Sequence, residues 1–457
     1  MTRGRWIGVG LGVALLVSIV GVVAYLSPIA PIATGYAAKI GCSGHFVGGR
    51  PFADAAGDLP DNPLVPLLRS SVDDDRGTVT ATLLGLWSST AWYTPGAGCT
   101  LADERPAFDV APPADGGSAA AAEWPRGDAV DAAAAVADQG IDGDALSAAV
   151  AGAFAEDDPA GRKNTRAVVV VHEGRIVAER YADGFDAATR LLGWSMGKSI
   201  TNAIVGRLGQ QGALAVGDSD LRPEWSGDAR ADITVDDLLH MTAGLAFDET
   251  HEPDTDVTRM LFTPGDTGAY AAAKELVAEP GTRWSYSSGT TNILCDVAHD
   301  ASGMGAAMAR ELVFGPLGMD SAVLEPDASG GLVCSSFPYA TARDWARFGQ
   351  WYLQDGEWDG QQLLPTGWVA ASTRPVRVET AQPYGAHWWL NEGADGGLRM
   401  PEVPADAFWA SGNEGQHTVV IPSADLVVVR LGFTSDFDGI DWGLERLLAG
   451  VVTATSP

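Results

Sequence analysis

Two stretches of the chain combine runs of β-branched residues with a short polar turn, as β-hairpins do. The first, Ala167 to Ala182 (AVVVVHEGRIVAERYA), places such runs on both sides of a His-Glu-Gly turn. The second, His417 to Phe433 (HTVVIPSADLVVVRLGF), repeats the arrangement near the carboxyl end of the chain. We therefore predict two antiparallel hairpins, one toward each end of a single domain.

Apolar residues recur with helical spacing in three further stretches. These are residues 144–156, residues 199–214 and a short segment that Thr234 caps in the sequence ITVDDLLHMTAGL. Helices between two hairpins predict an antiparallel sheet whose strands come from both ends of the domain. Within residues 144–457 we expect an α/β (α+β) fold, in which helices flank a central antiparallel sheet and a mostly helical subdomain is inserted.

The amino terminus has the pattern of a membrane segment. Arg3 and Arg5 precede an uncharged run of 21 residues, Trp6 to Leu26, which is long enough to span a bilayer as a helix. The basic flank should stay in the cytoplasm, which places the chain after Pro28 outside. We predict a single-pass transmembrane anchor over residues 1–27. A cleaved signal peptide, which would leave a secreted protein, is the alternative.

Residues 28–143 have mixed character and are predicted to be an extension and a linker. They contain a strand-like run, residues 78–86, and an aromatic stretch, WSSTAWY. Residues 101–140 are rich in alanine, proline, aspartate and glycine, which is typical of a linker or a loosely packed surface.

Charge and cysteine content narrow the function classes. The chain has 29 basic and 59 acidic residues, a net charge of −30, which argues against nucleic acid as a partner and against broad docking on anionic lipid. Four cysteines suit an exported, oxidising location. Their pairing does not follow from sequence. Cys42–Cys99 is the candidate disulfide because both lie in the amino-terminal region, and Cys295 and Cys334 either pair or stay buried thiols. No metal-ligand spacing is present, so we predict no metal and no cofactor.

The segment GWSMGKSITNAI, residues 193–204, fits three chemical motifs. A phosphate-binding loop would need glycine at Leu192, and an external location also argues against ATP. The G-x-S-x-G nucleophile elbow would need an apolar strand that runs into Gly193, and none is predicted. The third motif, S-x-x-K, pairs Ser195 with Lys198 and fits best, although Ser and Lys three residues apart also occur on ordinary surface helices.

The S-x-x-K pair can supply a nucleophile and its base. Residues three apart on a helix share a face, so Ser195 Oγ and the Lys198 amine can meet. A serine hydroxyl needs a base, and lysine is a base only when it is desolvated and neutral. Apolar neighbours such as Trp194, Met196 and Ile200 favour that state, and so does the positive end of the helix dipole.

A second element, WSYSSGTTN at residues 284–292, contains Tyr286 and Ser288. With S-x-x-K in place, the chain resembles the serine β-lactamase and penicillin-binding-protein superfamily, in its class C-like branch, and within it the 6-aminohexanoate-oligomer hydrolases and related esterases. The resemblance covers about residues 144–450 and implies a β-lactamase-like fold. It implies that Tyr286 relays a proton and that Ser288 stands where the family has asparagine.

The third family motif is changed. Where relatives have Lys-Thr-Gly or His-Thr-Gly, this chain has Ala410, a serine and Gly412, followed by Asn413. The resemblance implies an oxyanion hole formed by the Ser195 and Asn413 amides. Gly412 allows a close backbone approach, and Gln416 either lines the pocket or has a structural role. Loss of the cation at Ala410 argues against β-lactam or D-peptide carboxylate recognition.

These observations predict a membrane-anchored, extracytoplasmic serine hydrolase that acts on a small-molecule ester or amide. Neutral Lys198 activates Ser195, and Tyr286, with its pKa lowered by Lys198, protonates the leaving group before water cleaves the acyl-enzyme. A penicillin-binding-type peptidase and a non-catalytic sensor on the same fold remain alternatives. The sequence names neither the substrate nor the oligomeric state. Four tryptophans are candidates for pocket or core positions: Trp351, Trp358, Trp388 and Trp389.

Overall fold

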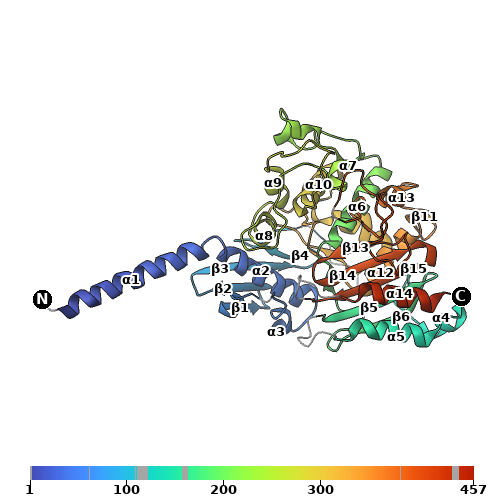
Figure 1. The fold of residues 1–457 in the computed structure, drawn as a ribbon, viewed down its shortest axis with the longest axis horizontal. Helices are drawn as coiled ribbons and strands as arrows, with labels where there is room; N and C mark the ends of the chain where they lie inside the picture. Colours follow the sequence, from blue (N-terminus) through green and yellow to red (C-terminus); the bar gives the residue numbers. More distant parts are fainter. Residues whose placement is uncertain are drawn as a thin grey trace.

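A six-stranded antiparallel sheet lies at the centre of the fold, in the order β12-β13-β14-β15-β5-β6 (Figure 1). One hairpin is β5 (Thr165–His172) with β6 (Arg175–Tyr181), and the other is β14 (Gln416–Ile421) with β15 (Leu426–Gly432). Strand β15 pairs directly with β5, so the two ends of the domain meet inside the sheet. The predicted sheet and both hairpins are confirmed. Strands β12 (Trp389–Leu390) and β13 (Phe408–Gly412) complete it.

Helices cover both faces of this sheet. The structure, a computed structural model, describes residues 3–60, 62–108, 110, 122–156, 163–380, 382–434 and 442–456. On one face, α5 (Gly143–Phe154) and α14 (Leu444–Thr455) pack against alternate strand residues such as Val168 and Val170. The opposite residues, such as Val169, face α6 (Met196–Gln210) and α12 (Ala342–Leu353). Every residue of β5 is therefore buried.

The inserted part of the domain is mostly helical, as predicted. A capping box of Thr234 and Asp237 begins α7, which confirms the predicted helix start. A small sheet in the order β7-β9-β8 joins this part to the rest. Its strands are β7 (Leu191–Leu192), β8 (Val323–Leu324) and β9 (Pro338–Ala340). The helices are α7 (Val235–Leu239), α8 (Asp256–Phe262), α9 (Thr267–Ala272), α10 (Ser288–Ser302), α11 (Gly315–Leu317) and α13 (Trp368–Ser372).

Residues 30–101, here called the N-terminal module, are more ordered than the composition indicated. Helix α2 (Ala30–Cys42) packs across a four-stranded antiparallel sheet, and a Cys42–Cys99 disulfide joins the helix to the last strand. Part of the stretch predicted as a linker is also folded, since Ala132–Gln139 forms α4 and Trp124 is buried. The other elements of the module are α3 (Phe52–Ala55), β1 (Leu68–Asp73), β2 (Thr78–Leu83), β3 (Trp87–Thr94) and β4 (Gly98–Leu101).

A buried carboxylate fastens the module to the rest of the protein. Glu325 has no exposed surface and lies 2.7 Å from the Lys39 amine. Its oxygens also accept hydrogen bonds from Ser43 Oγ at 2.9 Å and from the Cys99 amide at 2.6 Å. All three donors belong to the module. A carboxylate that is buried so completely requires these partners, so the module is an integral part of the fold.

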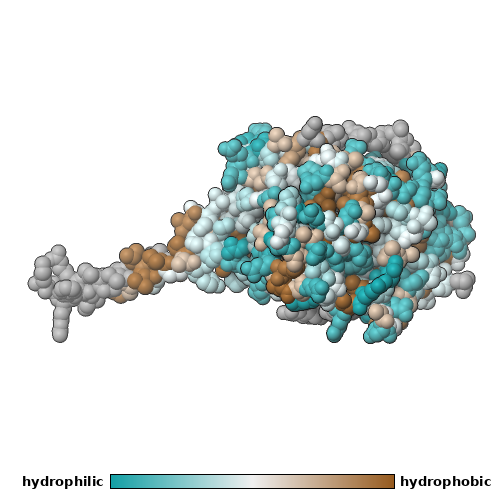
Figure 2. Space-filling view, turned by 90° about the horizontal axis from the view of Figure 1, so that it is seen from above, coloured by the Kyte–Doolittle hydropathy of each residue, from teal (hydrophilic) through white to brown (hydrophobic). Residues whose placement is uncertain are grey.

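Helix α1 (Arg3–Leu26) projects from the body, and the side chains nearest the body are apolar (Figures 1 and 2). Leu16, Val17 and Val20 are exposed. Over the part of the chain that the structure describes, no single helix has both the length and the apolar character needed to cross a membrane; Leu16–Leu26 and Ala30–Val47 meet the criterion only together, as a pair bent by 54°. The transmembrane anchor therefore stays a prediction.

Loss of the Lys39 amine should unfold the protein far more easily. In Lys39→Met the Glu325 carboxylate stays buried without its counter-charge, and removal of one partner of such a pair costs about 3–5 kcal/mol. Urea denaturation of the variant and the native protein measures this difference in the free energy of unfolding. The matched control is Lys274→Met, because Lys274 pairs with Asp256 at the surface and its loss should cost at most about 1 kcal/mol. Equal losses in the two variants would contradict the anchoring role.

Candidate active site

Ser195 and Lys198 meet at the start of α6. Ser195 directly precedes the helix and is half-buried, whereas Lys198 lies one turn on and is only 1% exposed. The Lys198 amine lies 3.0 Å from Ser195 Oγ, 3.0 Å from Ser288 Oγ and 3.3 Å from the Ser335 carbonyl oxygen. The predicted pair is therefore in direct hydrogen-bond contact, and oxygen atoms surround the amine.

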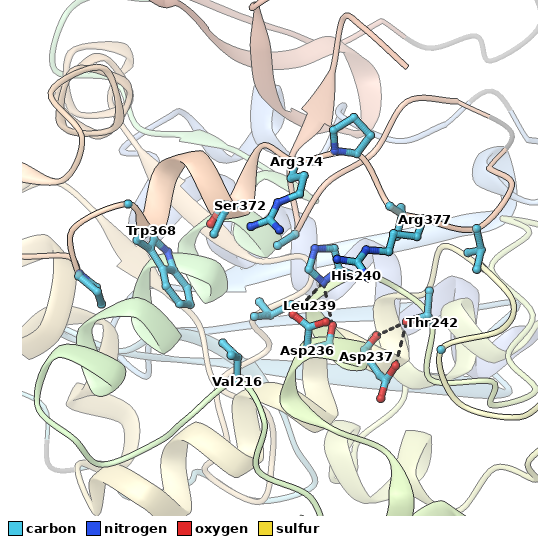
Figure 3. A pocket seen from close by; sticks show the side chains of 18 of the residues that line it. Val216, Asp236, Asp237, Leu239, His240, Thr242, Trp368, Ser372, Arg374 and Arg377 are labelled. Carbon is cyan, nitrogen blue, oxygen red and sulfur yellow. Dashed lines mark hydrogen bonds and ion pairs between the residues drawn. The ribbon is translucent and has the colours of Figure 1, made fainter. Parts of the chain in front are cut away.

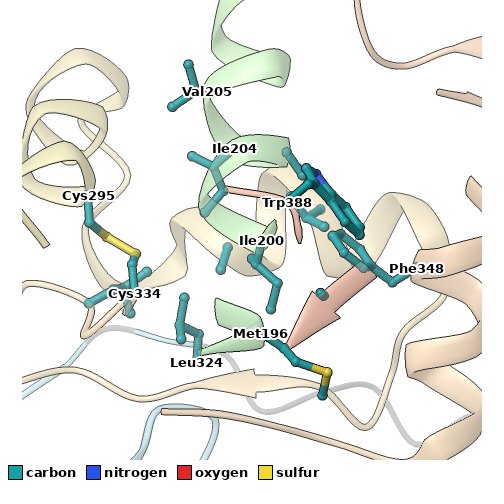
Figure 4. Packing of buried hydrophobic residues seen from close by; sticks show 14 of the residues in the cluster. Met196, Ile200, Ile204, Val205, Cys295, Leu324, Cys334, Phe348 and Trp388 are labelled. Carbon is teal, nitrogen blue, oxygen red and sulfur yellow. A yellow bond between two sulfur atoms is a disulfide. The ribbon is translucent and has the colours of Figure 1, made fainter. Parts of the chain in front are cut away.

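The hydrophobic core holds α6 in this position. Met196, Ile200 and Ile204 point from one face of the helix into the core, where they lie near Phe348 and Trp388 (Figure 4). The Cys295–Cys334 disulfide lies beside the same cluster. Because the apolar face is fixed by close packing, the direction in which Lys198 leaves the helix is fixed as well.

Gly197 allows the helix to approach the segment that supplies the Ser335 carbonyl. A Cβ at this position would lie 2.3 Å from the carbonyl oxygen of Cys334, which is far inside van der Waals contact. Any side chain would push the two segments apart. Gly197, which is also the second glycine of the incidental G-x-S-x-G pattern, is therefore required for packing.

Burial changes the acidity of Lys198. Removal of the amine from water lowers its pKa to about 8, and the negative charge of Glu249 works in the opposite direction. At a pH near this value a large fraction of the amine is neutral. A neutral amine 3.0 Å from a serine hydroxyl can act as a general base.

Tyr286 lies beside this pair, but its acidity differs from the prediction. Its phenol hydrogen-bonds with the Ser195 side chain, and the Lys198 amine lies 4.7 Å from the centre of its ring. Burial, and then the charge of Glu249, hold the pKa of the phenol well above its usual value. The predicted lowering by Lys198 is wrong, because the ammonium faces the ring and desolvation is the larger effect. Tyr286 is therefore a neutral hydroxyl that can both give and accept a proton.

Aromatic side chains form the wall around Tyr286. Its ring stacks on Trp389 at 5.4 Å and meets Tyr384 edge-on at 5.9 Å. A cavity of about 590 Å³ opens beside Trp284 and Tyr286 and offers room for a substrate. Of the four tryptophans singled out in the sequence, Trp389 contacts Tyr286, whereas Trp351 and Trp388 are fully buried core residues and Trp358 packs against the core.

Ser288 brings in a carboxylate that sequence inspection missed. The Ser288 hydroxyl lies 2.5 Å from Glu249 Oε1, and its amide donates to Glu249 Oε2 at 2.8 Å. Glu249 lies in an irregular acidic stretch without a motif. No local signal pointed to it, since only the tertiary structure brings residues 249 and 288 together.

The third motif lies against the nucleophile turn. Gly412 ends β13, and a Cβ there would lie 2.0 Å from the Gly193 carbonyl oxygen, so only glycine allows this contact. Asn413 follows directly in the chain. Ala410 is 1% exposed and brings no cation to the site.

Of the two roles considered for Gln416, its hydrogen bonds fit the structural one. It is buried, and its Nε2 donates to the carbonyl oxygens of Asn413, Glu414 and Gly432, at 3.1, 3.2 and 2.7 Å. These bonds use the amide to brace the loop that carries Asn413. Gln416 therefore stabilises the loop that carries Asn413. Its hydrogen bonds are made to the backbone of the protein and leave no evidence for a contact with substrate.

A second bond ties the Ser195 turn to the Asn413 loop. Trp194 Nε1 donates to Glu414 Oε2 at 2.8 Å, and both residues have left-handed backbone angles, with φ of 48° and 60°. Burial raises the pKa of the Glu414 carboxyl to about 7. Tyr36 of the N-terminal module packs on the Trp194 ring at 6.3 Å. The residues next to the two proposed oxyanion donors are thus held together, with the module against them.

Another hollow lies near the site without including it. This cavity of about 550 Å³ lies beside α7 and α13, and its polar lining includes Asp236, His240, Arg374 and Arg377 (Figure 3). Ser195, Lys198 and Tyr286 are not among the residues around it. The cavity beside Tyr286 has one of these three residues, Tyr286, in its lining, and Ser195 and Lys198 do not line it.

Trp194→Phe should reduce turnover more than it reduces stability. The variant leaves the buried Glu414 carboxyl without its donor, which costs about 1–3 kcal/mol, and it frees the Asn413 loop from the Ser195 turn. Thermal unfolding and the kcat for an activated ester measure the two effects. Trp92→Phe is the control, because the Trp92 indole of the N-terminal module donates a hydrogen bond to the carbonyl oxygen of Ala102, which directly follows the module. A loss of kcat in Trp92→Phe as large as that in Trp194→Phe would contradict the positioning role.

Comparisons with known proteins agree with this geometry. The chain is 26% identical over 305 residues to the 6-aminohexanoate-dimer hydrolase of Paenarthrobacter ureafaciens, a match that covers 61% of this chain and 75% of that protein. Among solved structures, a family VIII carboxylesterase matches with a TM-score of 0.53 and 18% identity, over 68% of this chain and 96% of the other. A Bacillus anthracis structure, provisionally named a 6-aminohexanoate-dimer hydrolase, matches with a TM-score of 0.52 and 24% identity, over 60% and 75%.

Structural matches at this level of identity show the fold alone. Together with the family match and the curated relative, they confirm the prediction of a hydrolase of the serine β-lactamase fold. The family model described as "Beta-lactamase" matches residues 106–444, well over half of the chain. The chain therefore belongs to the beta-lactamase family, within the superfamily of serine β-lactamases and penicillin-binding proteins.

Proposed function

We propose that the protein cleaves an ester or amide bond of a small molecule through an acyl-enzyme formed on Ser195. The observation that carries the proposal is the contact between the Lys198 amine and Ser195 Oγ, at 3.0 Å, in a place where burial lowers the pKa of the amine to about 8. A serine nucleophile and a partly neutral lysine base in contact are what acyl transfer needs.

Acylation then follows from the positions of these groups. Neutral Lys198 takes the Ser195 proton as Oγ attacks the carbonyl carbon, and the amides of Ser195 and Asn413 stabilise the oxyanion. The Tyr286 hydroxyl gives its proton to the leaving group and regains one from the Lys198 ammonium. A water molecule attacks the acyl-enzyme by the same route and releases the acid. No cofactor takes part.

Several features favour a substrate without a carboxylate that a cation at position 410 would hold. Ala410 offers no cation for a carboxylate, and aromatic side chains surround Tyr286. The relative from P. ureafaciens is named for hydrolysis of a 6-aminohexanoate dimer, a linear amide. Linear amides and simple esters are therefore the first substrates to examine, ahead of β-lactams and D-peptides.

Replacement of the nucleophile tests the proposal. Ser195→Ala should lose hydrolysis of activated esters and linear amide oligomers by a factor of at least about 10³, and a fluorophosphonate probe should label only the native protein. Ser199→Ala is the matched control, because Ser199 lies on the same helix and donates to the His387 carbonyl instead. It should still be labelled. Full hydrolysis by Ser195→Ala would refute the mechanism, and labelling without turnover would favour a sensor.

The proposal includes a place in the cell. Arg3 and Arg5 precede the uncharged run from Trp6 to Leu26 within α1, and the body carries two disulfides. We therefore place the body outside the cytoplasm, anchored to the cell membrane through residues 1–27. In cell fractionation the full chain should remain with the membranes and a chain that lacks residues 1–27 should be soluble. Membrane retention of the shortened chain would contradict the anchor, and release of a processed full chain would favour a cleaved signal.

A further inference from the structure

Two hydroxyl groups compete for the lone pair of Lys198. A neutral amine has two N–H groups and one lone pair. Three oxygens lie within hydrogen-bond distance of Lys198 Nζ: Ser195 Oγ, Ser288 Oγ and the carbonyl oxygen of Ser335. The carbonyl can only accept, so one N–H is directed to it. Either serine could then donate its proton to the lone pair, but only donation by Ser195 leads to acylation.

Glu249 decides between the two serines. Burial raises the pKa of the Glu249 carboxyl, whereas the charge of Lys198 and the two hydrogen bonds from Ser288 lower it. In its ionised form the carboxylate only accepts hydrogen bonds, and Glu249 Oε1 lies 2.5 Å from Ser288 Oγ. The single hydroxyl proton of Ser288 is therefore held by Glu249, in a short, charge-assisted bond. The Ser288 amide also donates to Glu249 Oε2 at 2.8 Å, which fixes the carboxylate in this orientation. With its proton held, Ser288 Oγ can only accept from Lys198.

We infer that Glu249 is a positioning residue for acylation: it holds the proton of Ser288 and thereby directs the lone pair of Lys198 to Ser195. The two N–H groups of the neutral amine are then used by Ser288 and the Ser335 carbonyl, and the lone pair faces the nucleophile. The inference rests on the proposed function, since it states which group holds each proton in that same site.

The negative charge of Glu249 makes Lys198 a less available base. It raises the pKa of Lys198 against the effect of burial, which reduces the neutral fraction of the base. It also raises the pKa values of Tyr286 and Tyr384. Asp248 lies next to it in the chain, and His251 lies within the field of Lys198. A carboxylate with no other role would only reduce the neutral fraction of Lys198. Control of the Ser288 proton compensates for this loss.

Glu249→Gln tests the inference. The amide can turn its NH₂ toward Ser288, which frees the Ser288 hydroxyl to donate to Lys198. We expect the plateau kcat for a neutral p-nitrophenyl ester to fall about tenfold or more. We also expect the acidic limb of the kcat/KM profile, at about pH 8 in the native enzyme, to move to lower pH because the charge that raises the Lys198 pKa is gone. This shift reports the loss of the charge alone, and the role of the Ser288 proton is read from the double-mutant cycle with Ser288→Ala.

Ser288→Ala supplies the second half of a double-mutant cycle. Without the Ser288 hydroxyl no second donor competes for the lone pair, so Glu249→Gln should cause no further loss of kcat in that background. Glu249→Asp, which keeps the carboxylate, should retain more activity than Glu249→Gln. Glu252→Gln is the matched control, because Glu252 lies in the same loop with an exposed side chain, and its profile should equal the native one. Circular dichroism verifies that each variant is folded.

The outcomes separate this inference from the proposed function. Native kcat in Glu249→Gln, or additive losses in the double variant, would overturn the role of Glu249, whereas loss of activity in Ser195→Ala would still support the Ser195 mechanism. Full activity in Ser195→Ala would overturn both. A lower plateau together with a shifted acidic limb, and no further loss in the Ser288→Ala background, would support the inference.

Discussion

The site depends on burying one amine without leaving it unsatisfied. Lys198 is 1% exposed, and removal from water is what lowers its pKa toward neutrality. A buried amine without partners would be costly, and three oxygens within 3.3 Å meet that need. Ser195 belongs to the start of α6 itself, so the fold has to bring the other two oxygens, those of Ser288 and Ser335, from separate segments to Lys198. Close contacts between backbone segments make this arrangement possible.

Glycines make the required contacts possible. At Gly197 helix α6 meets the Cys334 carbonyl, and at Gly412 the end of β13 meets the Gly193 carbonyl, at distances that exclude any Cβ. These contacts place the Ser335 carbonyl near Lys198 and Asn413 near Ser195. The bond between Trp194 and Glu414 joins the same two segments. The geometry that acyl transfer needs is thus set by backbone packing and then locked by side chains.

The N-terminal module takes part in this arrangement although it lies entirely outside the family match, which begins at residue 106. Tyr36 of the module packs on Trp194, and Lys39 of the module pairs with the buried Glu325. The partners of the buried Glu325 carboxylate, Lys39, Ser43 and Cys99, belong to the module, so the stability of the whole domain depends on the module. The chain therefore differs from a bare catalytic domain with a flexible tether.

Local patterns determined the parts of the protein that depend on nearby residues. The spacing of Ser195 and Lys198 places both on one helical turn in almost any context, and the β-branched runs could form only strands. Tyr286 and Gly412 followed from motifs. Tertiary structure alone decided the remainder, because burial and long-range contacts have no local signature. It brought Glu249 to Ser288, turned Gln416 into a brace, raised the pKa of Tyr286 through desolvation, and folded the N-terminal module onto Glu325.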